Sequence, residues 1–174
     1  MYLNNLTQMP NQLKTGLEPI TEDDFENYLN FQIQEYAKEK IKSGNWSEKN
    51  ALELSKKSFL NLLSNGKDTL GHSIMTIVNP NSHEKVGVLW VEWNNKEYNA
   101  TFIWDIIIYE NFRRKGFASG ALNQLENMCK EKGSSSICLH VFGHNKSAIT
   151  MYNSLGYYPT NIIMKKDLER TEKL

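Results

Sequence analysis

Apolar residues recur every three to four positions in two early stretches, as expected for one face of an amphipathic helix. In "TEDDFENYLNFQIQEYAKEKIKSG" a threonine and three acidic residues open the pattern and Gly44 closes it. In "SEKNALELSKKSFLNLLSNG" the pattern starts at Ser47 and stops near Gly66. A Ser or Thr before such a run and a glycine after it are helix-boundary signals. We therefore expect two helices, over residues 21–44 and 47–66.

After these two stretches the helical spacing of apolar residues ends. The next runs are rich in β-branched and aromatic residues, as is typical of strands. Three runs, "HSIMTIVN", "KVGVLWVEW" and "ATFIWDIIIY", are separated by turn sequences, which predicts an antiparallel meander. A short strand near "KTGLEPI" is expected before the helices. After the meander we expect a helix that ends at Gly133, a strand "SSICLHVF", a short helix "NKSAITMYNSLGY" and a closing strand "TNIIMKKDL".

The predicted order is therefore β-α-α-β-β-β-α-β-α-β. The strand-helix-strand step in the second half makes its two strands parallel, joined by a right-handed crossover. An α/β fold follows, with an open mixed, mostly antiparallel sheet and helices on both faces. A length of 174 residues fits a single domain over residues 1–174, of which 1–12 are candidates for a loose start.

Charge and composition narrow the function. The chain has 20 Lys and Arg residues and 20 Asp and Glu residues, which argues against a general binder of nucleic acid or membrane surfaces. Neither a signal peptide nor a membrane-length apolar run is visible, so we expect a cytoplasmic protein. Cys129 and Cys138 have no metal-ligand spacing; we expect free, buried thiols and no metal site.

One stretch, "NFRRKGFASG", carries candidate chemistry, because two arginines, a lysine and a glycine stand where a helix begins. A helix N-terminus exposes unpaired N–H groups and the positive end of the helix dipole. Such a place suits an anion, above all a phosphate. The alternative, a basic turn before a surface helix, stays open from this stretch alone. Walker-type and dinucleotide-binding glycine patterns are absent.

Two motifs in this context resemble those of the GNAT N-acetyltransferase family. The first is "RRKGFA", residues 113–118. The second is "LHVFGHNKSAITMYNSLGYY", with Asn145, Ala148 and Tyr152 in the family's spacing, followed by Gly156 and Tyr157. Together they cover residues 102–158, and the chain looks similar to small bacterial acetyltransferases of unassigned substrate.

The resemblance implies transfer of an acetyl group from acetyl-CoA to an amine, by direct attack in a ternary complex. It implies that backbone N–H groups hold the pyrophosphate, from Arg114, Lys115, Gly116, Phe117, Ala118 and Ser119, with added charge from Arg113. It also implies that the pantetheine arm lies along Ile106, Ile107 and Ile108 and meets Asn145. The isoleucines are equally expected in a buried strand, and Asn145 also suits a helix cap.

Catalytic groups follow from the same resemblance. Tyr152 stands at the family's place for the acid that protonates the departing thiolate, with simple helix packing as its alternative. His140 is a candidate base or a core histidine. Asp105 is the next candidate, as a base acting through water, as a group that binds the acceptor's ammonium, or as a carboxylate merely held by the backbone. Glu92 is a distant third, and Phe102 occupies the place where histone-acetylating relatives carry a glutamate.

The resemblance implies an acceptor amine on a small molecule or a peptide, and the candidate walls of its site are Trp46, Trp90, Trp93 and Trp104. A covalent acetyl-enzyme is not expected, because neither cysteine occupies a catalytic place of the family. Two rival functions remain, a CoA-binding sensor or interaction module without turnover and a transferase of longer acyl groups. A homodimer is a candidate assembly by resemblance only.

Overall fold

The structure is a computed structural model that describes residues 15–166. They fall into two compact units, one ending at Phe142 and one beginning at Gly143. The expected loose start, residues 1–12, lies outside the described residues.

The first unit contains one five-stranded sheet in which the strands lie side by side in chain order. Its members are β1 (Gly16–Pro19), β2 (His72–Val78), β3 (Lys85–Asn95), β4 (Ala100–Ile108) and β5 (Ile137–Leu139). The pairs from β1 to β4 are antiparallel, and β4 pairs with β5 in parallel. The predicted meander and the predicted parallel step are both confirmed.

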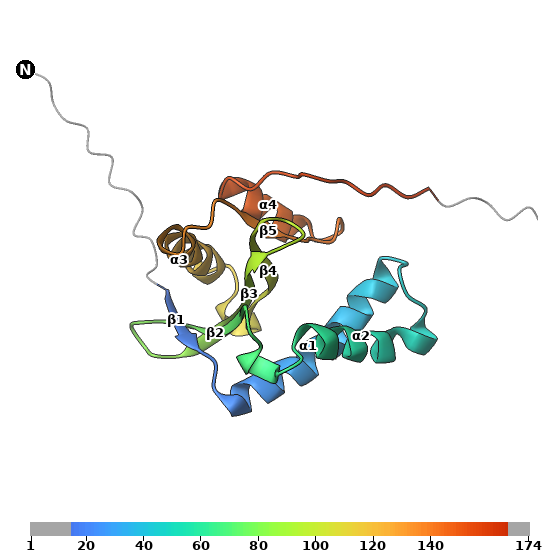
Figure 1. Cartoon of the computed structure of the whole chain (residues 1–174), viewed down its shortest axis with the longest axis horizontal. Helices are drawn as coiled ribbons and strands as arrows, with labels where there is room; N and C mark the ends of the chain where they lie inside the picture. Colours follow the sequence, from blue (N-terminus) through green and yellow to red (C-terminus); the bar gives the residue numbers. More distant parts are fainter. Residues whose placement is uncertain (1–14, 167–174) are drawn as a thin grey trace, which may run out of the picture. The chain divides into compact units, whose positions relative to one another are not determined.

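Helices cover both faces of this sheet, as predicted. In the first unit these are α1 (Glu22–Lys42), α2 (Glu48–Leu62) and α3 (Phe117–Glu131), with short 3₁₀ turns η1 (Gly66–Asp68) and η2 (Glu110–Phe112). Figure 1 shows α1 and α2 on one side of the sheet and α3 on the other. The second unit contains α4 (Lys146–Ser154).

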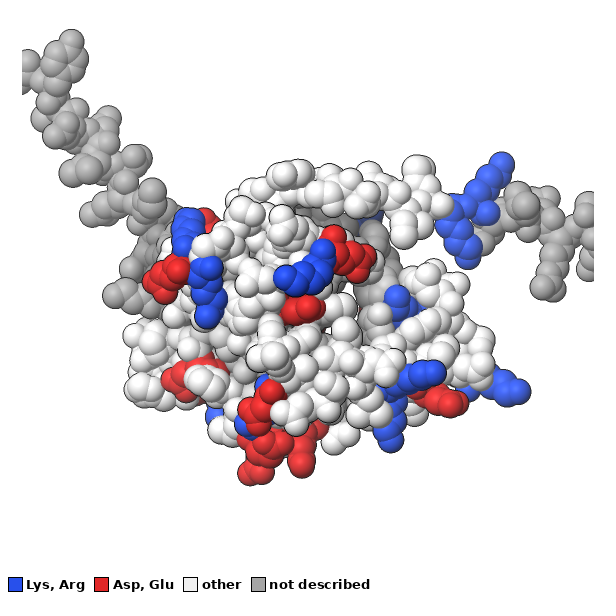
Figure 2. Space-filling model, viewed as in Figure 1, with Lys and Arg blue, Asp and Glu red and all other residues white. Residues whose placement is uncertain are grey.

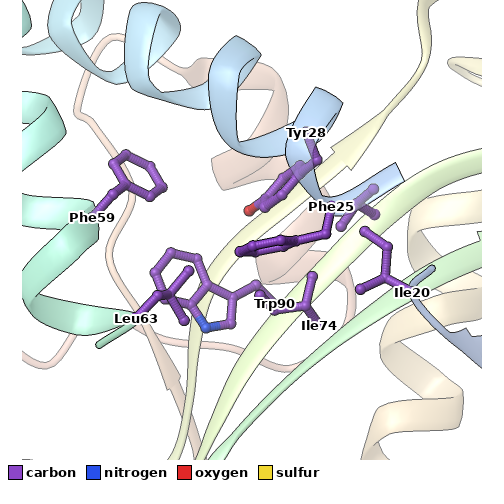
Figure 3. Close-up of a cluster of buried hydrophobic side chains, with 8 residues drawn as sticks. Ile20, Phe25, Tyr28, Phe59, Leu63, Ile74 and Trp90 are labelled. Carbon is purple, nitrogen blue, oxygen red and sulfur yellow. The ribbon is translucent and has the colours of Figure 1, made fainter. Parts of the chain in front are cut away.

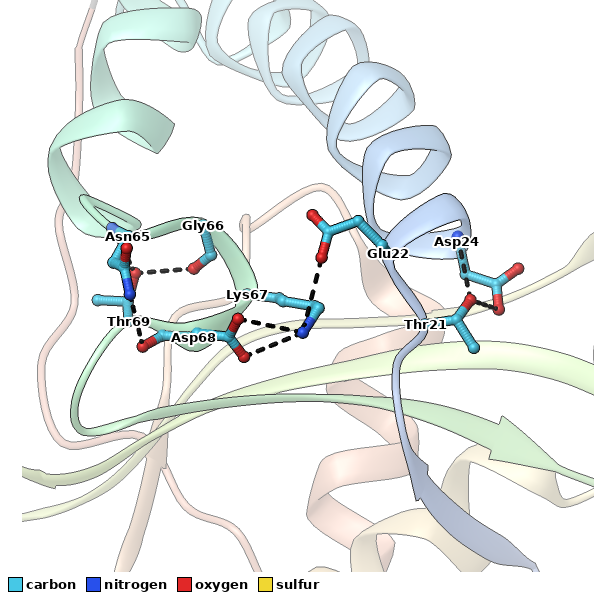
Figure 4. A network of polar contacts seen from close by, with 8 residues as sticks. All are labelled: Thr21, Glu22, Asp24, Asn65, Gly66, Lys67, Asp68 and Thr69. Carbon is cyan, nitrogen blue, oxygen red and sulfur yellow. Dashed lines mark hydrogen bonds and ion pairs between the residues drawn. The ribbon is translucent and has the colours of Figure 1, made fainter.

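The start of α1 follows the sequence signal. The Thr21 side chain accepts a hydrogen bond from the backbone N–H of Asp24 at 3.3 Å, which satisfies one of the unpaired donors of the first turn. Figure 4 shows this cap beside a second polar contact, in which Lys67 bridges Glu22 at 3.6 Å and Asp68 at 3.0 Å. Of these contacts, the ion pair between Lys67 and Glu22 joins the start of α1 to the turn that follows α2.

A mostly apolar cluster holds α1 and α2 against the sheet. Figure 3 shows side chains from the two helices meeting those of β2 and β3 around the Trp90 ring. The fully buried members of this cluster are Ile20, Phe25, Tyr28, Phe59, Leu63, Ile74, Val88 and Trp90. A buried aliphatic or aromatic side chain contributes about 1.5–3 kcal/mol, so this cluster fixes where α1 lies over β3 and β4.

The predicted bounds of α2 and β5 were wrong. Helix α2 ends at Leu62 rather than near Gly66, because Leu63 leaves helical geometry and buries its side chain in the cluster just described. Strand β5 covers 137–139 rather than 135–142, since its pairing with β4 stops at Ile103.

The closing strand predicted over residues 160–168 does not form in residues 160–166. Residues 167 and 168 lie outside the described part. Ile162, Ile163 and Met164 are 75%, 97% and 90% exposed. A β-branched run has the local preference of a strand, but a strand also needs a neighbour for its backbone groups.

Charged side chains of both signs are interspersed on the face seen in Figure 2, in keeping with the neutral composition. No helix within residues 15–166 is long and apolar enough to cross a membrane.

Candidate active site

The basic turn leads into α3 through a strained backbone. Gly116 is the N-cap of α3 with φ +86°, and Arg114 also has a positive φ, +58°. Within the described part of the chain, the backbone N–H groups from Arg114 to Ser119 donate to no acceptor. Six consecutive unpaired donors at a helix N-terminus are able to hydrogen-bond an anion. These residues therefore fit the pyrophosphate that the resemblance implies.

Side chains of the same turn fasten it to the fold. Phe117 is 4% exposed and meets Phe112 edge-on, with ring centroids 6.1 Å apart. The Nε atom of Arg113 donates to the carbonyl of Ile108 at 3.0 Å, and the Lys115 Nζ lies 5.6 Å from the Phe112 ring. Phe117 thus offers only its backbone to a ligand. The exposed face of the turn is its backbone and the charges of Arg114 and Lys115.

Strand β4 carries a bulge in the middle of its length. Trp90 is paired with Asp105 and Val91 with Ile103, so Trp104 is an extra residue on β4. The parallel pairing with β5 ends at Ile103, one residue before the bulge. From there on, no other described strand pairs with the second edge of β4, and Ile106 to Ile108 are half-buried rather than enclosed.

Asp105 lies directly after the bulge and is held by α1. Its Oδ2 atom accepts hydrogen bonds from the hydroxyl of Tyr28 at 2.9 Å and from the Nε2 of Gln32. Burial raises the pKa of Asp105 to about 6, while the bonds from Tyr28, Gln32 and the N–H of Ile106 act in the opposite direction. The residue as a whole is half-buried, and the packing around its carboxyl group removes most of the hydration of that group.

The indole N–H groups of Trp90 and Trp104 form hydrogen bonds within the sheet. The indole N–H of Trp104 donates to Glu92 at 3.0 Å and that of Trp90 to the Nδ1 of His72 at 3.0 Å. Trp90 and Trp104 stack with centroids 5.7 Å apart, and Trp90 is only 2% exposed. Trp90 is therefore core, whereas the half-buried Trp104 remains a candidate wall. Glu92 accepts from both Trp104 and Asn95, which makes it a holder of the bulge.

His140 follows β5 directly and is exposed, so it is neither a strand residue nor a core histidine. Its ring lies edge-on to that of Phe142, with centroids 5.0 Å apart. Removal of water by neighbouring protein, and then the positive charge of Lys40, lower the pKa of His140 below its usual value. The imidazole is therefore neutral at pH 7 and able to accept a proton.

Asn145 and Tyr152 belong to the second unit. Asn145 is the N-cap of α4, and its Oδ1 accepts from the backbone N–H of Ala148 at 3.2 Å. The helix-cap alternative is therefore confirmed, with the side-chain N–H₂ group left for other partners. The ring of Tyr152 lies 5.5 Å from that of Tyr157. The structure brings Asp105, the free edge of β4 and the basic turn together in the first unit.

Sequence reasoning missed Tyr28 and Gln32, which hold Asp105, and Lys40, whose positive charge acts on His140. One signal was available for the first pair. Both residues lie one turn apart on the apolar face of α1, where a buried polar side chain needs a partner. Their partner, 73–77 residues away in sequence, could not be identified from the chain alone. Among the described residues no three His, Cys, Asp or Glu side chains are grouped to hold a metal ion.

Comparison with known proteins places this arrangement in a family. Residues 26–157 match the acetyltransferase (GNAT) family. The chain is 39% identical over 153 residues to YdgE and 35% identical over 153 residues to YycN, both described as uncharacterised N-acetyltransferases of Bacillus subtilis. Each alignment covers 87% of this chain and 97% of the relative. The crystal structure of YycN, described as an acetyltransferase, superimposes with a TM-score of 0.84 at 33% identity, over 90% of this chain and all of YycN. The chain therefore belongs to the GNAT family and is an N-acetyltransferase.

Proposed function

We propose that this enzyme transfers an acetyl group from acetyl-CoA to a primary amine by direct attack in a ternary complex. The observation that carries the proposal is the run of six unpaired backbone N–H groups around Gly116. This run follows the free edge of β4, so one continuous surface offers donors for a pyrophosphate and a strand edge for an extended amide-containing arm. Acetyl-CoA contains both groups.

Two groups are candidates to take the proton from the attacking amine. Asp105, with a pKa of about 6, is largely ionised at pH 7 and can accept a proton or bind the acceptor's ammonium. His140, with its lowered pKa, is neutral at the same pH and can also accept a proton. Tyr152 is proposed as the acid that protonates the thiolate, because an ordinary tyrosine stays protonated at neutral pH.

The cysteines support direct attack. Cys129 is buried on α3, and burial raises the pKa of its thiol, which keeps it in the unreactive thiol form. Cys138, expected to be buried, is half-buried because β5 is an edge strand among the described strands. A covalent acetyl-enzyme is therefore not part of the proposal.

The experiment is a panel of amines and amine-bearing peptides with acetyl-CoA, followed by CoA release and product mass. We expect one amine class to give an acetylated product 42 Da heavier on the acceptor. For that amine, double-reciprocal plots at several acetyl-CoA concentrations should intersect, as a ternary complex requires. Parallel lines would contradict direct attack, since they indicate a covalent intermediate.

The two rival functions are outcomes of the same experiment. CoA binding without turnover on any amine would favour a sensor or interaction module. If turnover is faster with a longer acyl-CoA than with acetyl-CoA, the proposed reaction becomes transfer of that longer acyl group.

A further inference from the structure

Lys40, near the end of α1, is enclosed by aromatic rings. Its Nζ lies 5.2 Å from the ring centroid of Tyr36, 5.5 Å from that of Trp46 and 5.9 Å from that of Phe142. We call these three rings the Lys40 cage. They come from α1, from the loop after α1 and from the segment after β5, and Tyr36 and Trp46 meet edge-on at 5.5 Å. Aromatic faces around a cation hold it by electrostatic attraction.

The Lys40 cage borders the proposed reaction centre. Phe142, one of its rings, is also the ring against which His140 packs. His140 directly follows Leu139, the last residue paired with β4, and that partner, Ile103, stands just before the bulge. The cage thus lies next to His140, where β4 and β5 cease to pair.

We propose that Lys40 is a self-acetylation site: without an external amine, the enzyme transfers the acetyl group of acetyl-CoA to the Lys40 Nζ. The inference rests on the proposed function. The Lys40 ammonium gives a proton to His140, and the free amine attacks the thioester carbonyl carbon. A C–N bond forms and the C–S bond breaks. The attacking nitrogen then gives up a second proton, the sulfur leaves with its electron pair and takes up that proton, and His140 releases the first proton to solvent. The products are CoA and a neutral acetyl-lysine.

Acetylation at this place has a physical consequence. The amide that replaces the ammonium carries no charge, so the attraction to the three rings is lost. The positive charge that disfavours protonation of His140 disappears at the same time. The pKa of His140 should therefore rise on modification, and an NMR titration of the imidazole reports it independently of turnover.

Neighbouring lysines on α1 provide matched controls. Lys38 lies two residues earlier, on another side of the helix, where it is exposed and pairs with Glu35 at 2.6 Å. Lys42 lies two residues later and is also exposed. Both should react only at the background rate of any exposed lysine with acetyl-CoA.

The test is incubation of the full chain with acetyl-CoA and no amine, followed by peptide mass mapping over time. We expect acetyl-Lys40 to form at least tenfold faster than acetyl-Lys38 or acetyl-Lys42. The first-order rate constant should not change on tenfold dilution of the protein. Lys40→Arg should remove that signal, Lys38→Arg should leave it, and Gly116→Ala should slow it through weaker acetyl-CoA binding. Equal labelling of the three lysines, or a rate constant that falls on dilution, would overturn the inference.

The amine panel separates this result from the proposed function. Turnover of an external amine with Lys40 unlabelled overturns self-acetylation and leaves the proposed function standing. No turnover and no selective labelling overturn both. Selective labelling of Lys40 without turnover of any panel amine supports the inference and shows that the first unit can direct acetyl transfer to an amine.

Discussion

Replacement of Gly116 by alanine tests the anion site with little other disturbance. Gly116 has φ +86°, and an ideal Cβ built there meets no heavy atom within 4 Å. The free energy of unfolding should therefore fall only because of the backbone conformation, since the left-handed region costs a non-glycine residue about 1–2 kcal/mol. The same methyl group stands on the open side of the turn, where a phosphate would approach the backbone.

Gly133, just beyond the other end of α3, is a matched control. It has φ +75° and likewise has nothing within 4 Å of an added Cβ. In urea denaturation, Gly116→Ala and Gly133→Ala should each lose about 1–2 kcal/mol of unfolding free energy. In calorimetry, Gly116→Ala alone should bind CoA at least tenfold more weakly, equivalent to about 1.4 kcal/mol. Equal CoA affinity in the two variants would refute the assignment of the phosphate site.

Three further predictions concern Asp105 and the strand that carries it. The pKa of Asp105 is raised from 3.8 to about 6, so the native state binds more protons than the unfolded state between these two values. The free energy of unfolding should therefore fall by up to about 3 kcal/mol as the pH rises through this window. Asp105→Asn should lack this loss in urea titrations from pH 4 to 7, and an unchanged pH dependence would contradict the raised pKa. Tyr28→Phe removes a bond to the ionised carboxyl and should raise the pKa of Asp105 further, so the rising step of the pH–rate profile moves to higher pH if Asp105 is the base. If that step stays in place in Tyr28→Phe and disappears in His140→Gln, His140 is the base. Gly87→Ala should lower the free energy of unfolding by at least about 3 kcal/mol in urea denaturation, because the added Cβ would overlap the carbonyl oxygen of Ile107 on β4. A loss under about 1 kcal/mol would mean that the backbones of β3 and β4 do not approach each other this closely at Gly87.

Local signals predicted most of the fold. Thr21 and its acidic followers cap α1 as expected, and the alternating runs form β2, β3 and β4 in the predicted order. The parallel step from β4 to β5 followed from the strand-helix-strand order of that part of the chain. These features depend on residues a few positions apart, so a single sequence contains them.

Features that depend on distant partners were not predictable in this way. Leu63 ends α2 because its side chain occupies a buried position in the cluster around Trp90. The spacing of apolar residues along the helix does not indicate that such a position exists. Ile162 and its apolar neighbours have the composition of a strand but no strand in the described residues. In the site, Asp105 was identified from its place on β4, while its two partners on α1 could be identified only from the fold.

The short length of β5 has a direct consequence for the site. If β5 paired with β4 beyond Ile103, the backbone groups from the bulge to Ile108 would be satisfied within the sheet, and nothing would be left to bind an extended ligand. Because pairing stops there, that edge must find its partners elsewhere, in water or in a ligand. Arg113 already takes the Ile108 carbonyl at the far end, which joins the edge to the basic turn. The length of the open edge is therefore fixed at both ends, by the last pair with β5 and by Arg113, and a ligand that binds there must turn toward Gly116 after Ile107.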